Sequence, residues 1–156
     1  GADPVFAGLA TSIVNIAVLS GSVLIPLISD RFGLIKPFML GSAVISAILV
    51  FIAWNIPFGV LSVVVFVIQG ILTGGLIPLC KALPALLPDI KPDYVGSAGG
   101  VQSTLQNVGA FLVPSYIIAP IAGSNMNIIF MGVAITFMLV GLLCIPMPEW
   151  GAKARK

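Results

Sequence analysis

Five long apolar runs, none of which contains a charged side chain, constrain this chain more than any other feature. A hydrocarbon core of roughly 30 Å is crossed by about 20 helical residues. Lipid offers no partner to backbone polar groups, so only helices or closed barrels cross it, and uninterrupted apolar stretches such as 47–52 lack the alternation of a barrel strand. We therefore predict an all-α membrane protein, one membrane domain over residues 1–156, with helical spans at 5–28, 37–54, 58–80, 95–122 and 127–146.

Composition favours the lipid bilayer over water as the surroundings of this fold. Charged residues make up 8% of the chain and hydrophobic residues 59%, whereas a soluble domain carries about 25% charged residues. Polar side chains so sparse could not cover the surface of a globule of this size in water.

The positively charged residues predict the orientation of the spans. They occupy the first and third gaps between spans and the tail 147–156, whereas the second and fourth gaps carry none. Loops with Lys and Arg stay cytoplasmic, so we expect a cytoplasmic C-terminus and an outside N-terminus, as an odd number of crossings requires. The protein is predicted to be a multi-pass plasma-membrane protein. The residues concerned are Arg31, Lys36, Lys81, Lys91, Lys153, Arg155 and Lys156.

Several classes of function are disfavoured by what the sequence lacks. The chain has no His and no acid within a span, so we expect no metal site, no cofactor and no intramembrane relay of carboxylates. No Ser or Cys has a base near it, which argues against an enzyme. The chain also lacks the filter-like repeat that would favour a channel. The net charge of +2 gives no sign of nucleic-acid binding. Cys80 and Cys144 both fall near the cytoplasmic side and are expected to be free thiols.

Uncharged polar residues are unevenly distributed among the spans. The second span has only Ser42 and Ser46 in its interior, and the fifth has only Thr136 past its start, so these two spans could face lipid nearly all round. Carboxamides near mid-membrane are costly unless paired or hydrated, and those four residues apart share a helix face. We predict that the first, third and fourth spans line a shared polar cavity on the substrate path. Its residues are Asn15, Gln69, Thr73, Gln102, Gln106 and Asn107.

An alternative is that these side chains only form hydrogen bonds between helices and hold the bundle together. Small residues predict close helix contacts as well, because Gly70 with Gly74 and Gly96 with Gly100 form GxxxG pairs. Prolines within or near the ends of spans can kink a helix, which suits a mobile gate but also occurs in static bundles. They are Pro26, Pro78, Pro114 and Pro120.

The first gap resembles the signature loop of the major facilitator superfamily of secondary transporters. That loop has the form Gly-x-x-x-Asp-Arg-x-Gly-Arg-Arg, joins helices 2 and 3, and recurs more loosely between helices 8 and 9. Asp30, Arg31 and Gly33 match, Pro26 stands in place of the first Gly, and the basic pair is replaced by apolar residues. Gly33 permits a turn that other residues resist, and Asp30 can cap a helix N-terminus. The departures fit the looser second copy.

The resemblance extends over nearly the whole chain, as helices 8 to 12. The segments 83–88 and 96–100 are similar to the junction of helices 10 and 11, and 146–153 is similar to the Pro-Glu tail after helix 12. The resemblance implies a cavity lined by helices 8, 10 and 11, with helices 9 and 12 outside, and two halves that rock around a midplane site. It further implies that Asp30 contacts a helix end of the missing N-terminal half and stabilises the outward-facing state.

Three hypotheses remain. The first is the C-terminal part of a transporter for a small solute, whose partners are the missing N-terminal half and helix 7. The chain begins at Gly1, without Met and without a basic leader, so we expect a piece of a longer polypeptide, or a processed or cloned fragment. The second places the chain at helices 2 to 6, with the basic tail as the central loop. The third is a membrane scaffold or accessory subunit whose polar residues mediate only helix packing and which has no water-accessible cavity.

Overall fold

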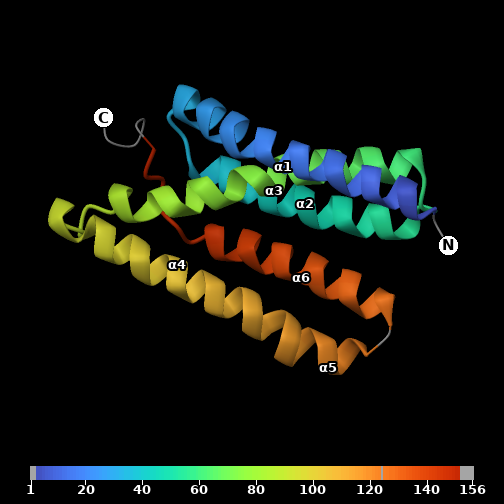
Figure 1. Cartoon of the computed structure of the whole chain (residues 1–156). Coiled ribbons are helices and arrows are strands. Elements are labelled where there is room, and N and C mark those ends of the chain that lie inside the picture. The colour runs from blue at the N-terminus through green and yellow to red at the C-terminus, as the bar shows by residue number, and fades with distance from the viewer. Residues whose placement is uncertain (1–2, 124, 152–156) are drawn as a thin grey trace.

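The computed structural model describes residues 3–123 and 125–151, and every regular element in this part of the chain is helical (Figure 1). Five helical segments are long and apolar enough to cross a membrane, which confirms the predicted all-α membrane fold. Lys153, Arg155 and Lys156 of the predicted basic tail lie outside the described residues. The segments are α1 (Pro4–Phe32), α2 (Lys36–Asn55), α3 (Val60–Leu86), a composite fourth segment (Pro92–Ala122) and α6 (Met126–Cys144).

The fourth segment is not a uniform helix. It opens with a 3-10 turn at Pro92–Tyr94, continues as α4 (Val95–Leu112), passes through the π-helical stretch Val113–Ile118 and ends as α5 (Ala119–Ala122). Pro114 lies at the start of the π-helical stretch and lacks the N–H that would bond one turn back. The wider turn therefore begins where the sequence removes a regular helical hydrogen bond.

Three C-terminal helix ends differ from the predicted span ends by two residues or more. α1 continues past residue 28 to Phe32, α3 continues through Pro84 to Leu86, and α6 ends at Cys144, before residue 146. The predicted ends followed the loss of hydropathy, but a helix can continue into the interface, where water solvates its polar side chains. Asp30 and Arg31 are therefore in the last turn of α1 and not in a loop.

The helices alternate in direction, so the connections α1–α2 and α3–α4 lie at one end of the bundle together with residue 151 (Figure 1). We call this the basic end, because Arg31, Lys36 and Lys91 lie there. The connection α2–α3, the turn before α6 and the start of α1 lie at the opposite end. The gaps that carry Lys or Arg therefore lie at one end of the helix bundle, and the uncharged gaps lie at the other end.

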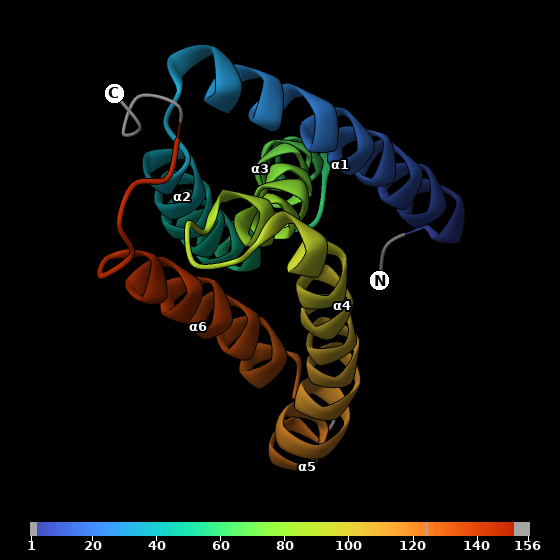
Figure 2. The same ribbon diagram turned by 90° about the vertical axis from the view of Figure 1, so that its left-hand side faces the viewer.

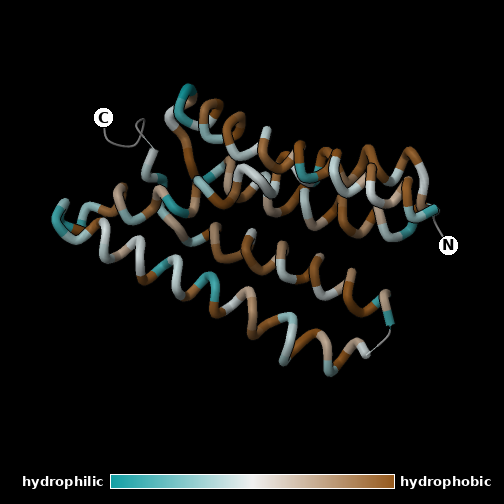
Figure 3. Tube along the Cα trace, in the orientation of Figure 1, coloured by the Kyte–Doolittle hydropathy of each residue, from teal (hydrophilic) through white to brown (hydrophobic). Residues whose placement is uncertain are grey.

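Helix α3 is central and packs against α1, α2 and α4, while α6 packs mainly against α2. Figure 2 shows α1, α3 and α4 bordering one side of the bundle, with α2 and α6 on the other side. The hydropathy trace of α6 is mostly hydrophobic, whereas α4 carries hydrophilic positions along its length (Figure 3). The spans that are richest in polar residues are therefore neighbours in space.

Glycines allow α1 and α3 to lie in close contact. A methyl group at Gly74 would overlap the backbone carbonyl of Val18, and one at Gly70 would lie 3.3 Å from the carbonyl oxygen of Val14. The predicted packing role of the Gly70 and Gly74 pair is confirmed. In contrast, a methyl group at Gly96 or Gly100 would meet no atom within 4 Å in the described part of the chain.

The most buried apolar cluster lies near the basic end and joins α2, α3 and α6. Its buried members include Met39, Ala43, Leu79 and Cys144. At the opposite end, Trp54 of α2 stacks on Phe130 of α6 with ring centroids 4.6 Å apart. Most other large apolar side chains are exposed, as expected for a bundle whose outer surface contacts lipid tails.

Candidate functional site

The six residues predicted to line a cavity all lie on α1, α3 and α4, the helices that border one side of the bundle (Figure 2). Asn15 of α1 and both Gln106 and Asn107 of α4 are exposed. Gln69 and Thr73 of α3 and Gln102 of α4 are half-buried. The structure thus separates the six into three side chains that are free to contact another molecule and three that are engaged within the bundle.

Gln69 and Thr73 form a local pair on α3. The Gln69 Nε2 donates to Thr73 Oγ1 at 2.8 Å, and that hydroxyl donates to the backbone carbonyl of Gln69 at 2.8 Å. The two residues are one turn apart, so the helix itself brings them together. The pair leaves the Gln69 Oε1 as an acceptor, so this side chain can still accept a hydrogen bond from another molecule.

Gln102 joins α4 to α3. Its Nε2 donates to the backbone carbonyl of Cys80 at 2.8 Å. Asn15 lies elsewhere, in a hollow of about 340 Å³ between α1 and α3 that Thr11 and Phe66 also line. The structure therefore brings Gln69 to Thr73 and Gln102 to Cys80, but it does not gather all six predicted residues in one pocket.

The signature residues form a compact helix ending at the basic end. Gly33 has φ 66°, in the left-handed region, and its N–H donates to the carbonyl of Asp30 at 3.1 Å. The N–H of Leu34 donates to the carbonyl of Ser29 at 3.2 Å, which completes the paired bonds of a Schellman ending. The hydroxyl of Ser29, which is fully buried, donates to the carbonyl of Leu34 at 2.6 Å.

The charges of the signature residues remain on the surface. Arg31 is exposed in the last turn of α1, where a cation interacts favourably with the helix dipole. Asp30 is also exposed, and within residues 3–123 and 125–151 its carboxylate has no hydrogen-bond or ion-pair partner. It is therefore available to contact another protein segment.

Glu149 is a functional candidate that sequence reasoning missed. Its Oε1 accepts from the N–H of Ile35 at 2.7 Å, and its Oε2 accepts from the N–H of Lys36 at 3.1 Å. These amides begin α2, which has no capping side chain of its own, because Ile35 occupies the N-cap. Asp30, which the sequence suggested as a helix cap, does not take this place. The missing cap before 36 and the Pro-Glu pair at 148–149 were the signals available.

The segment around Glu149 is fixed to the signature turn by further contacts. The Glu149 Oε1 also accepts from the N–H of Gly151 at 2.8 Å, and Lys36 Nζ donates to the carbonyl of Ile145 at 2.6 Å. A methyl group at Gly151 would overlap the backbone of Gly33. The residues after α6 thus form a strap across the α1–α2 turn, which we call the tail strap (145–151).

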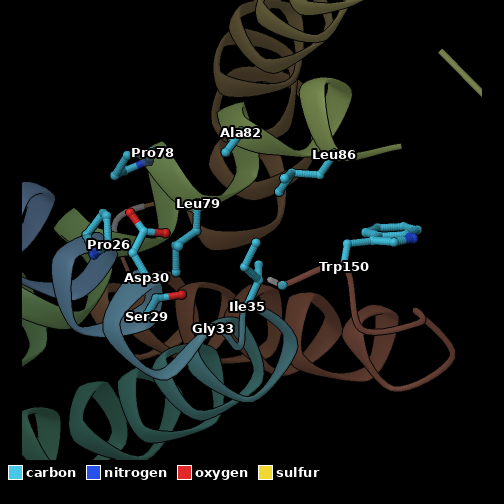
Figure 4. A pocket seen from close by; sticks show the side chains of 11 residues that line it. Pro26, Ser29, Asp30, Gly33, Ile35, Pro78, Leu79, Ala82, Leu86 and Trp150 are labelled. Atoms are coloured by element: carbon cyan, nitrogen blue, oxygen red, sulfur yellow. The ribbon is translucent and has the colours of Figure 1, made fainter. Parts of the chain in front are cut away.

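A pocket of about 470 Å³ opens beside this turn, between α1, α3 and the tail strap. Figure 4 shows Asp30 at its edge, with the carboxylate on the side of Pro78 and Leu79, while Trp150 lies across the pocket. The remaining walls are mainly apolar. Among residues 3–123 and 125–151, no cluster of three His, Cys, Asp or Glu residues is placed to hold a metal ion.

Comparison with known proteins gives a family for this arrangement. The family model described as Major Facilitator Superfamily matches residues 1–154. No curated protein and no solved structure gave a match. The family match spans all five helical segments, the Asp30, Arg31 and Gly33 turn and the tail strap. The family match covers nearly the whole sequence, and the chain belongs to the Major Facilitator Superfamily.

Proposed function

We propose that this chain forms helices 8 to 12 of a transporter that moves a small solute across the plasma membrane by alternating access. Membership of the superfamily makes it a membrane transporter of the major facilitator type, and its five apolar helices make it a multi-pass membrane protein. Helices 8 to 12 as the position of the chain, a small solute as the substrate and alternating access as the mechanism are what we propose beyond this. Both secondary active and facilitated transport are included, because none of the predicted spans carries an acid. A proton- or ion-coupling carboxylate would therefore lie in the missing part of the transporter, and without one transport would be facilitated diffusion.

The observation that carries the proposal is the segregation of polar side chains in space. The predicted carboxamides all lie on α1, α3 and α4, which border one side of the bundle, whereas α2 and α6 lie on the other (Figure 2). Polar groups inside a membrane are costly, so they are retained where they line a water-filled path or serve a function. Asn15, Gln106 and Asn107 are the exposed members of the set and the proposed substrate-facing residues.

The pocket at the basic end supports a partner for Asp30. We propose that this pocket receives a helix end from the N-terminal half of the same transporter when the cytoplasmic side closes. The missing N-terminal half and helix 7 are the proposed partners of this chain. A helix N-terminus carries partial positive charge and free N–H groups, which match the unpaired Asp30 carboxylate at the edge of an apolar pocket. In this proposal the basic end is cytoplasmic and the start of α1 is outside, as the distribution of Lys and Arg favours.

A second candidate function is a membrane scaffold or accessory subunit. It is favoured by the hydrogen bonds of Gln69 to Thr73 and of Gln102 to Cys80, which show half of the predicted residues engaged in the bundle. It does not explain Gln106 and Asn107, which are exposed and adjacent in the middle of the fourth segment. The transporter hypothesis therefore explains more of the polar residues.

Thiol labelling distinguishes the two functions. In the complete protein, with Cys80 and Cys144 replaced by alanine, one sample carries Gln106→Cys and a matched sample carries Ile135→Cys on the exposed face of α6, near the middle of that helix. We expect a membrane-impermeant thiol reagent to label position 106 and a transported solute to slow that labelling. Position 135 should not react, because lipid covers it. Absence of labelling at position 106 in the folded protein would support the scaffold and contradict the transporter.

A further inference from the structure

Pro84 interrupts the hydrogen bonding of α3 close to the basic end. In an α-helix the N–H of residue 84 would bond to the carbonyl of residue 80, but proline has no N–H. Pro84 is buried and the helix continues through it to Leu86. The carbonyl of Cys80, a half-buried residue, therefore loses its regular partner, and a carbonyl that stays unpaired away from water is costly.

Gln102 supplies the donor that Pro84 lacks. Its Nε2 lies 2.8 Å from the carbonyl oxygen of Cys80. The carbonyls of Ser22 and Gly74 lose their regular partners in the same way, to Pro26 and Pro78, yet no side chain of the described residues donates to either of them. The pairing of a proline gap with a carboxamide thus occurs at the contact between α3 and α4.

This hydrogen bond matters because α4 has few other contacts. No residue of Val95–Leu112 is buried, and methyl groups at Gly96, Gly99 and Gly100 would meet no atom within 4 Å. Within residues 3–123 and 125–151, it is the side-chain hydrogen bond that joins Val95–Leu112 to another helix. A bond at this place restricts both the rotation of α4 and its height along α3.

We propose that Gln102 is a positioning residue, which uses the carbonyl freed by Pro84 to hold α4 so that Gln106 and Asn107 face the substrate path. Gln106 lies one turn beyond Gln102 on the same helix face, so any rotation of α4 at Gln102 changes where the Gln106 carboxamide points. The part of this inference that concerns substrate rests on the proposed function. The pairing of Gln102 with the Pro84 gap does not.

A double-mutant cycle in the complete protein tests the pairing without any substrate. The reporter is the rate at which a cysteine at Ala98, one turn before Gln102, reacts with a thiol reagent in a background without Cys80 and Cys144. Gln102→Ala should raise this rate about threefold, as expected for one hydrogen bond between membrane helices. Pro84→Ala restores the N–H of residue 84, so Gln102→Ala should have no effect in that background. Gln106→Ala is the matched control and should change the rate in neither background.

Two results would overturn the proposal: no change with Gln102→Ala, or the same rise whether residue 84 is proline or alanine. Gln102→Met serves if Pro84→Ala fails to fold, because a thioether of similar size cannot donate a hydrogen bond. It should act like alanine, and a wild-type rate would show that no donor is needed. Since no outcome depends on transport, failure of the pairing and failure of the transporter proposal are distinguishable.

Discussion

Replacing Glu149 with alanine tests whether the tail strap stabilises the signature turn. The substitution removes the acceptor of three backbone N–H groups, those of Ile35, Lys36 and Gly151. Two of these N–H groups begin α2, where the chain offers no other capping side chain among the residues that the structure describes. The loss is therefore equivalent to removing an N-cap together with the anchor of the strap.

The expected magnitude follows from these bonds. Loss of an N-cap side chain costs about 0.5–2 kcal/mol, and loss of a negative charge at a helix N-terminus costs about 0.3–1 kcal/mol. Glu149 is half-buried, so solvent reduces the electrostatic part. We expect the free energy of unfolding to fall by about 2 kcal/mol, and the midpoint of thermal unfolding to fall with it.

Thermal unfolding of the detergent-solubilised complete protein measures this change. Glu149→Gln keeps one acceptor oxygen and should lose about half as much stability. The control is Asp89→Ala, which removes an exposed acid at the same end and should change the free energy of unfolding by less than about 0.5 kcal/mol. Equal midpoints for Glu149→Ala and Asp89→Ala would refute the capping role.

Three further predictions test the packing. Gly74→Ala should lower the free energy of unfolding by about 1–3 kcal/mol because its methyl group overlaps α1. Gly41→Ala, with open space around it in the interior of α2, should not lower it in the same thermal assay; equal effects would contradict the close packing of α1 and α3. Gly33→Ala should cost about 1 kcal/mol in chemical denaturation, since residue 33 has a positive φ, and an unchanged midpoint would refute a strained turn. Trp54→Ala and Phe130→Ala should show a coupling energy of about 1 kcal/mol in a double-mutant cycle on the stacked rings, and additive effects would count against the stack.

The five spans could be predicted from the sequence because the physical signal is local. A run of apolar residues long enough to cross lipid must form its hydrogen bonds within itself, so helix type and number follow from hydropathy alone. The helices α1 and α3 continue past the predicted span ends at 28 and 80, to Phe32 and Leu86. A drop in hydropathy marks where the hydrocarbon ends, and the helix itself ends where a residue such as Gly33 stops it.

The contacts of the candidate site could be predicted only where they are local. The pairing of Gln69 with Thr73 follows from their spacing of four residues. The bond of Gln102 to Cys80 and the cap that Glu149 places on Lys36 join residues that are 22 and 113 positions apart. Helical periodicity carries no information about which distant segments meet. A proline gap in α3 and an uncapped start of α2 show only that a partner is needed.

The central claim, alternating access around α1, α3 and α4, is tested most directly by measuring accessibility at both ends of the bundle. Cysteines are placed singly at Ala7, in the hollow between α1 and α3 near the opposite end, and at Ala82, in the pocket at the basic end, in the complete protein without its native cysteines. Asp30→Ala is then introduced into each. Loss of the Asp30 contact should raise thiol labelling at position 82 and lower it at position 7, because the outward-facing state is weakened. Labelling that changes in the same direction at both positions, or at neither, would contradict alternating access.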